Sequence, residues 1–151
     1  LSHFSNAERR YEILGEFFGS TLVSDYAHHH SEIKATLDAA TKQAHQEIIA
    51  VYQPHTFSRT KEFLSETAQA FKGASHVVIT DIYAAREVNT YGIHATDLVA
   101  AIKNESIDCT YVANLSDLKE ALTPLCHSGA TLLMLGAGSI DQAARQLAKG
   151  E

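Results

Sequence analysis

The fold is decided by the run Ile48-Ile49-Ala50-Val51-Tyr52, which is apolar throughout and is followed at once by the polar stretch Gln53-Pro54-His55-Thr56-Phe57-Ser58-Arg59-Thr60. A continuous apolar run of this length is typical of a strand covered on both faces, as in a parallel sheet. Residues 76–80 and Thr131–Leu135 have the same character. These runs predict a sheet of parallel strands with helices on both sides.

The segments around these runs alternate between strand and helix patterns. Apolar residues recur at helical spacing in residues 33–40, 64–71, 98–102, 115–125 and 140–147. Thr96-Asp97 and Ser139-Ile140-Asp141-Gln142 look like polar caps at the start of two of these helices.

Three further stretches have the character of strands. Residues 107–112 follow one of the helices, and residues 11–17 and 21–23 form a predicted hairpin across Phe18-Gly19-Ser20. The whole order predicts a single α/β domain over residues 1–151. We expect a Rossmann-like three-layer domain with a mostly parallel sheet and one antiparallel edge strand from the N-terminal hairpin.

Composition excludes several classes of protein. A chain of 151 residues buries roughly 68–70% of its unfolded surface, which is enough for one core. No stretch approaches the roughly 20 apolar residues of a membrane span, and the start shows no signal peptide. The net charge is −6 with Lys and Arg scattered singly, so we expect no nucleic-acid partner. The absence of a starting Met suggests a piece of a longer protein.

The polar residues of the chain collect after the predicted strands. Residues 25–31, 53–59, 82–92, 113–116 and 136–139 all follow a strand end, and parallel strands bring these ends to one edge of the sheet. The richest are Asp25-Tyr26-Ala27-His28-His29-His30-Ser31 and the stretch after Tyr52, which place histidines, a Tyr, an Asp and an Arg in two loops. We expect these two loops to face each other and to bind a ligand.

The sequence gives weaker evidence for other kinds of site. Three consecutive histidines could bind zinc or nickel, but adjacent residues do not converge on one ion, so we predict no metal site. Gly136-Ala137-Gly138 resembles the start of a dinucleotide-binding loop but lacks its third Gly; it is predicted to form a tight turn whose N–H groups could meet an anion. No GxxxxGK[ST] loop occurs, so most of any nucleoside triphosphate site would lie elsewhere.

Five motifs resemble those of the C-terminal domain of the Mur ligases and occur in the same order as in that family. The resemblance is strongest to the members that join L-alanine to UDP-N-acetylmuramate. The five motifs cover nearly the whole chain: Arg9-Arg10-Tyr11-Glu12, Asp25-Tyr26-Ala27-His28-His29, Tyr52-Gln53-Pro54-His55-Thr56-Phe57-Ser58-Arg59-Thr60, Ile82-Tyr83-Ala84-Ala85-Arg86-Glu87 and Gly136-Ala137-Gly138-Ser139-Ile140.

The resemblance implies a cytoplasmic, ATP-dependent ligase of peptidoglycan synthesis with three domains. ATP and Mg2+ would be bound mainly by a central P-loop domain that is absent here, an acyl phosphate would form on the muramoyl carboxylate, and an amino acid would attack it to give an amide. This chain would be the third domain, which binds the amino acid and closes the active site but is inactive alone.

The resemblance also assigns roles to single residues. It implies that Arg10 and Asp25 reach ATP across the interdomain cleft, and we accordingly expect Asp25 to have few contacts within its own domain. It implies that the incoming L-alanine is held by His55 and Arg59, with Tyr26 and His28 nearby.

Three more residues are implied as possible contributors from the edge loops: Arg86, Gly136 and Gly138. Neither a catalytic residue nor a metal ligand is expected in this domain.

Two alternatives stay open at this point. The same domain occurs in murein peptide ligases, which attach a recycled tripeptide to the same nucleotide sugar; the Ile82–Glu87 motif favours the L-alanine enzyme. The chain could instead be a stand-alone module that binds an amino acid without catalysis.

Overall fold

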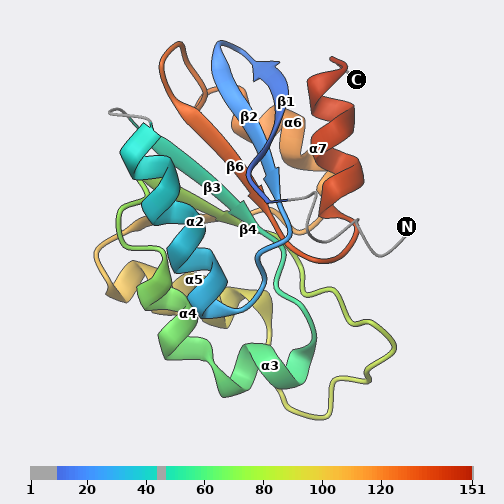
Figure 1. Ribbon diagram of the computed structural model, residues 1–151. Coiled ribbons are helices and arrows are strands. Elements are labelled where there is room, and N and C mark those ends of the chain that lie inside the picture. The colour runs from blue at the N-terminus through green and yellow to red at the C-terminus, as the bar shows by residue number, and fades with distance from the viewer. Residues whose placement is uncertain (1–9, 44–46, 151) are drawn as a thin grey trace.

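The structure is a computed structural model that describes residues 10–43 and 47–150 (Figure 1). Arg9, which begins the first of the five motifs, lies outside these residues. Six strands form one sheet in the order β1-β2-β6-β3-β4-β5. Their bounds are β1 (Glu12–Phe17), β2 (Ser20–Asp25), β3 (Ile48–Tyr52), β4 (His76–Ile79), β5 (Asp108–Tyr111) and β6 (Thr131–Leu135).

Helices cover both faces of this sheet, as Figure 1 shows. One face carries α2 (His30–Gln43), α4 (Leu64–Ala70) and α5 (Ala95–Asn104), and the other carries α6 (Leu118–Leu122) and α7 (Ile140–Ala148). The short helix α3 (Phe57–Glu62) lies at the edge, and a 3-10 turn, η2 (Leu115–Asp117), precedes α6. None of the helices in the described residues is both long and apolar enough to cross a membrane.

The central strand β3 shows why the sheet has two cores. Ile48, Ala50 and Tyr52 point into the core formed with α2, α4 and α5. Ile49 and Val51 point into the core formed with α6 and α7. Side chains alternate between the two faces of a strand, so an unbroken apolar run fits only a strand buried on both sides. The predicted three-layer domain with a mostly parallel sheet is confirmed.

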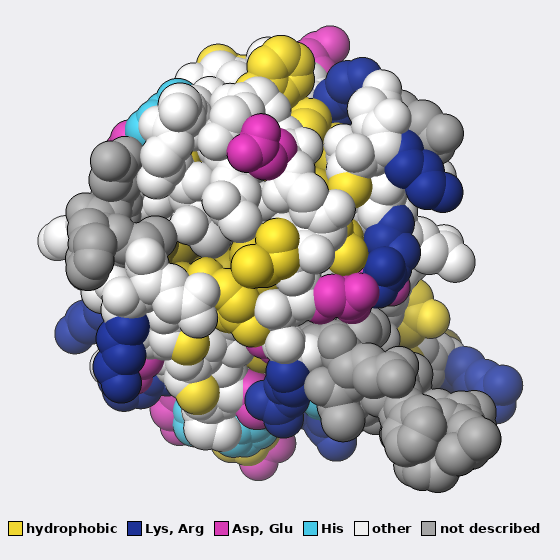
Figure 2. All heavy atoms as spheres, turned by 45° about the horizontal axis from the view of Figure 1, so that its top comes forward, with side chains coloured by type: hydrophobic (Ala, Val, Ile, Leu, Met, Phe, Trp, Pro, Cys, Tyr) yellow, Lys and Arg dark blue, Asp and Glu magenta, His cyan; other side chains and the backbone are white. Residues whose placement is uncertain are grey.

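The N-terminal hairpin supplies the single antiparallel pair. β1 pairs with β2 from Glu12 opposite Ser24 to Phe17 opposite Ser20. It lies at the sheet edge, and Ile13 and Phe18 are 61% and 57% exposed. Figure 2 shows apolar side chains gathered in the middle of one face of the molecule, with Lys and Arg side chains spaced around its margin.

The predicted helix starts need correction. α5 begins at Ala95 after His94, and Asp97, instead of serving as the cap itself, accepts the His94 N–H at 2.9 Å from inside the helix. Ser139 makes no capping bond of its own. Instead the Gln53 side chain accepts the Ile140 N–H at 3.2 Å and donates to the Ser139 hydroxyl at 3.1 Å. Gln53 can do so because β3 and β6 are neighbours.

Two predicted helical segments also differ in extent. The apolar spacing over residues 115–125 is divided between η2 and α6, and α6 ends at Leu122. The helix predicted at residues 64–71 is preceded by α3, which begins at Phe57, so part of the predicted loop 53–59 is helical.

Asp25 does not have the few contacts that we expected. It is 2% exposed, and its two carboxylate oxygens accept the backbone N–H groups of Tyr11 and Ala27, each at 2.8 Å. The side chain thereby ties the start of β1 to the loop that follows β2. Because both N–H groups lose their partner when the carboxylate is removed, Asp25 is a structural residue of this domain.

We therefore predict that Asp25→Ala lowers the free energy of unfolding of the isolated domain by about 1.5–3 kcal/mol, the usual cost of losing hydrogen bonds to a charged group. Asp25→Asn should cost less, since one amide oxygen can still accept. Urea unfolding measures both. Asp38→Ala is the matched control, because Asp38 is 60% exposed in a surface pair with Lys34. Equal losses for Asp25→Ala and Asp38→Ala would contradict the structural role.

Candidate functional site

Three adjacent strands build the candidate site at one edge of the sheet. β6 lies between β2 and β3 and runs parallel to both, so the loops after Asp25, Tyr52 and Leu135 leave the sheet side by side. The helix after β2 covers one face and the helix after β6 covers the other. A crevice between such diverging connections is where α/β proteins bind ligands.

The loop after β6 is small, and its glycines make room for neighbours. A Cβ on Gly136 would lie 2.8 Å from Ile140 Cγ2, and one on Gly138 would lie 2.8 Å from both Gln53 Oε1 and Tyr83 Cγ. The two glycines therefore allow Gln53 and Tyr83 to pack over this loop. The Gly136 N–H of the predicted anion-binding turn donates to the Asp25 carbonyl at 3.2 Å, and the first N–H of α7 donates to Gln53, so neither is open to an anion.

Side chains from β3 and α2 hold the histidine loop after β2 in place. The Tyr52 hydroxyl donates to the His28 carbonyl at 2.7 Å. Glu32 Oε1 accepts the N–H groups of His28 and His29, each at 3.2 Å, from the first turn of α2. The His28 ring lies edge-on to Tyr26, with 5.2 Å between ring centroids. Burial raises the pKa of Tyr52, which keeps its hydroxyl a donor.

His55 and Arg59 come from the opposite side, on the segment after β3. The Thr56 N–H donates to the Tyr83 carbonyl and the Tyr83 N–H donates to the Pro54 carbonyl, both at 2.8 Å. This short parallel ladder stacks the His55 ring on Tyr83 at 5.5 Å. The His28 and His55 rings also lie 5.5 Å apart. The two polar loops therefore meet, as predicted.

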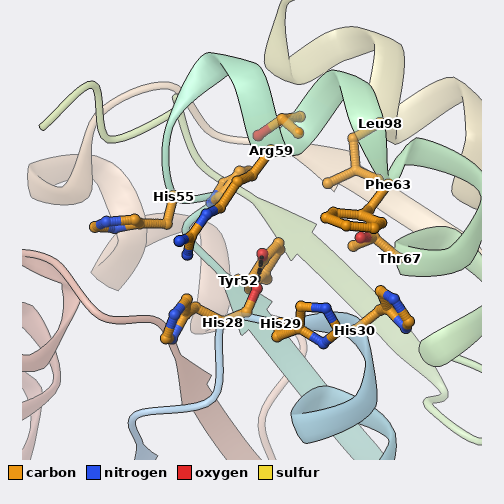
Figure 3. A pocket seen from close by; sticks show the side chains of 11 residues that line it. His28, His29, His30, Tyr52, His55, Arg59, Phe63, Thr67 and Leu98 are labelled. Carbon is orange, nitrogen blue, oxygen red and sulfur yellow. Dashed lines mark hydrogen bonds between the residues drawn. The ribbon is translucent and has the colours of Figure 1, made fainter. Parts of the chain in front are cut away.

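Figure 3 shows the resulting pocket, with Arg59 reaching from α3 toward the space between His55 and His28. At the other end, the Phe63 ring lies 5.3 Å from the rings of both His29 and His30. The enclosed volume is about 20 Å³, room for about one water molecule or a methyl group. The pocket thus joins a cationic end to a small, largely aromatic end.

Two groups in this pocket lack partners. His55 Nδ1 is buried and makes no hydrogen bond in the described part of the chain. Arg59 forms no ion pair with any residue within 10–43 and 47–150. Partial burial lowers the pKa of His55, and the positive charges of His28 and Arg59 lower it further, against the opposing effect of Glu87. At neutral pH the site therefore offers a neutral imidazole beside a permanent cation.

The other predicted site residues are not among those that line this pocket. Arg10 is half exposed and lies 3.7 Å from Glu32, which connects it to the His28 loop. Partial burial acts to raise the pKa of Glu32, but the N–H groups of His28 and His29 and the charges of His28 and Arg10 lower it overall. Arg86 is exposed on its loop, with a positive φ of 79°, and does not line the pocket.

Sequence patterns missed several residues that shape the site. Glu32 has a recognisable signal, since it stands three residues after the polar residue that precedes α2. Phe63, Thr67 and Leu98 look like ordinary helix residues, yet all three line the pocket. Gln53, Tyr83 and Glu87 act through contacts across loops, for which a single sequence has no local signal.

We predict that His55 titrates below the ordinary value of 6.5 in an NMR pH titration, because its protonated form is partly buried next to Arg59. Arg59→Ala should raise the pKa of His55, while burial keeps it below 6.5. Lys61→Ala removes another cation from the same helix and should leave the titration unchanged. A pKa of His55 that does not respond to Arg59→Ala would mean that the two side chains are not neighbours.

Comparison with known proteins shows that the chain is similar in sequence to part of a group of ligases. A sequence model described as "Mur ligase, glutamate ligase domain" matches residues 9–138. The UDP-N-acetylmuramate–L-alanine ligase of Lachnospira eligens is 43% identical over 149 residues, which are 99% of this chain and 32% of that protein. The chain thus spans about a third of the length of this relative.

Solved structures share the fold. The UDP-N-acetylmuramate-alanine ligase of Thermotoga maritima superposes with a TM-score of 0.74 at 23% identity, over 94% of this chain and 29% of that one. A murein peptide ligase of Psychrobacter arcticus gives the same TM-score at 19% identity, with the same coverage. At these sequence identities the two superpositions show a common fold. They do not distinguish an L-alanine ligase from a murein peptide ligase.

Proposed function

We propose that this chain, which belongs to the Mur ligase family, is the C-terminal domain of an ATP-dependent ligase that adds L-alanine to UDP-N-acetylmuramate. The five ordered motifs and the 43% identity to a protein of that name support this. The domain would bind the amino acid and close over an active site that is otherwise formed by the remainder of a cytoplasmic enzyme.

The observation that carries the proposal is the Arg59 guanidinium beside His55 at a very small pocket, where it has no ion-pair partner in the described part of the chain. A guanidinium holds a carboxylate through two charge-assisted hydrogen bonds, which are about twice as strong as neutral ones. His55 and His28 lie where they can add hydrogen bonds, and Tyr26 supports His28. A pocket of about 20 Å³ suits a methyl side chain, the side chain of alanine.

ATP and Mg2+ are assigned mainly to a part of the enzyme outside this chain, because the sequence has no GxxxxGK[ST] loop. Arg10 would extend from this domain toward the ATP phosphates. Asp25 would act on ATP mainly through Arg10, because its carboxylate holds the N–H of the next residue, Tyr11. Glu32 pairs with Arg10 at 3.7 Å and would release it when a phosphate competes.

A separate closing domain fits the chemistry of the proposed reaction. ATP would phosphorylate the muramoyl carboxylate, and the amine of L-alanine would attack the acyl phosphate to form the amide and release phosphate. Acyl phosphates hydrolyse, so the amine must meet them with water excluded, and closure of a domain that carries the amine achieves this.

The murein peptide ligase is the second candidate, and the fold does not separate the two. The Ile82–Glu87 motif and the 43% identity to a UDP-N-acetylmuramate–L-alanine ligase favour the first candidate. A stand-alone binding module is the third candidate. The native sequence before Leu1 distinguishes it from a ligase, since a ligase requires a GxxxxGK[ST] loop there.

We predict that the isolated domain folds but neither hydrolyses ATP nor forms an amide bond, since it has no phosphate-binding loop. Phosphate release, measured with the purified fragment and with the full-length protein, tests this. Release by the fragment above that of a preparation from cells without it would overturn the assignment of ATP to another domain.

In the full-length enzyme, Arg59→Ala should raise the apparent KM for L-alanine by about 10- to 150-fold, which corresponds to the 1.5–3 kcal/mol of a hydrogen bond to a charged group. The KM for ATP should hardly change. Lys61→Ala, which removes an exposed cation from the same helix, is the control. Equal effects on both substrates would place the carboxylate elsewhere, with Arg86 the next candidate. Activity of the wild-type enzyme with the tripeptide and none with L-alanine would favour the second candidate.

A further inference from the structure

Glu87 fastens the loop after β4 to the first turn of α3. Its carboxylate accepts the Phe57 N–H at 2.7 Å, the Ser58 N–H at 3.1 Å and the Ser58 hydroxyl at 2.5 Å. Phe57 and Ser58 are the first two residues of α3, and Arg59 is the third. One side chain therefore accepts three hydrogen bonds from the two residues that precede Arg59, the residue proposed to hold the substrate.

The start of α3 depends on this side chain because its own cap is poor. Thr56 precedes the helix with φ at +67°, a conformation that is unfavourable for a β-branched residue. Its hydroxyl accepts the Arg59 N–H at 3.4 Å, which is a long hydrogen bond. The helix has six residues, too few to be stable without outside contacts. Glu87 satisfies two of the N–H groups that a helix start leaves unpaired.

We propose that Glu87 is a positioning residue for the amino-acid carboxylate, setting the direction of Arg59 through the first turn of α3. This inference rests on the proposed function. Glu87 does not line the pocket, and it forms no ion pair with Arg59 in the described part of the chain. It therefore acts through the helix and leaves the guanidinium available for the substrate.

The charge of Glu87 suits this role. The hydrogen bond from the Ser58 hydroxyl is the main cause that lowers the pKa of Glu87, and the N–H groups of Ser58 and Phe57 add to it. The side chain is therefore ionised at neutral pH. A carboxylate at a helix start also interacts favourably with the helix dipole. These donors offset part of its negative charge, which still reaches the site, since it acts to raise the pKa of His55.

The backbone ladder between the two loops predicts what happens without Glu87. Thr56 and Tyr83 remain joined through their backbone groups, and the His55 ring remains stacked on Tyr83. Removal of the Glu87 carboxylate should therefore loosen the first turn of α3 while the sheet and the adjoining helices stay folded. The expected consequence is weaker amino-acid binding with little change in ATP use.

The test uses the full-length enzyme and compares Glu87→Ala with Glu87→Gln. Glu87→Ala should raise the KM for L-alanine about ten-fold or more and leave the KM for ATP within about two-fold. Glu87→Gln should be milder, because its amide oxygen still accepts an N–H. Asp97→Asn is the matched control, since Asp97 is also a carboxylate that accepts an N–H at a helix start but lies on α5. It should leave both KM values unchanged.

A double variant separates positioning from a merely structural role. If Glu87 acts through Arg59, then Glu87→Ala should cause little further loss of L-alanine binding in an Arg59→Ala enzyme. Amide hydrogen exchange at Phe57 and Ser58 should quicken in Glu87→Ala, with the strands unaffected. An additive loss in the double variant, or an unchanged KM for L-alanine in Glu87→Ala, would overturn the inference.

The same measurements distinguish the inference from the proposed function. A wild-type enzyme that does not use L-alanine would overturn the proposed function, and the positioning role would fall with it. If the wild-type enzyme uses L-alanine and Arg59→Ala weakens its binding, a normal KM in Glu87→Ala would refute the role of Glu87 alone.

Discussion

The pairing of β6 with both β2 and β3 is the constraint on which the site depends. β6 is the last strand in the chain, yet it lies in the middle of the sheet and is buried on both faces. Because all three strands are parallel, their carboxyl ends deliver His28, Gly136 and His55 to one edge. The short glycine loop after β6 leaves room for the flanking loops to meet above it.

Two carboxylates hold the halves of the pocket in place. Glu32 accepts N–H groups at the start of α2 and orders the His28 loop, and Glu87 does the same for α3 and Arg59. Neither is the partner of Arg59 among the described residues. Within residues 10–43 and 47–150, these two acidic groups bond backbone donors and Arg59 has no ion-pair partner. This arrangement favours an incoming anion over an internal ion pair.

The size of the pocket and the proposed chemistry both suit a small amino acid. A zwitterionic amino acid requires a cation for its carboxylate, and L-alanine requires space for one methyl group. The Arg59 end supplies the cation, and the cavity of about 20 Å³ has room for the methyl group. Asp25 lies further along the same edge, where it joins β1 to the His28 loop. Changes to Asp25 therefore act on the fold of this domain as well as on any contact to ATP.

The sequence by itself determined most of the elements and the edge of the sheet at which the polar loops meet. The run Ile48–Tyr52, the hairpin pattern and the helical spacings predicted three layers, because local periodicity reports which faces a segment buries. It also predicted that His28, His55 and Arg59 lie close together, since polar residues after buried strands collect at one edge. Tertiary structure alone decided the strand order, the bonds of Asp25, the use of Gln53 at the start of α7 and the contact of Glu87 with α3. Each of these depends on which distant segments become neighbours, and a local pattern does not contain that information.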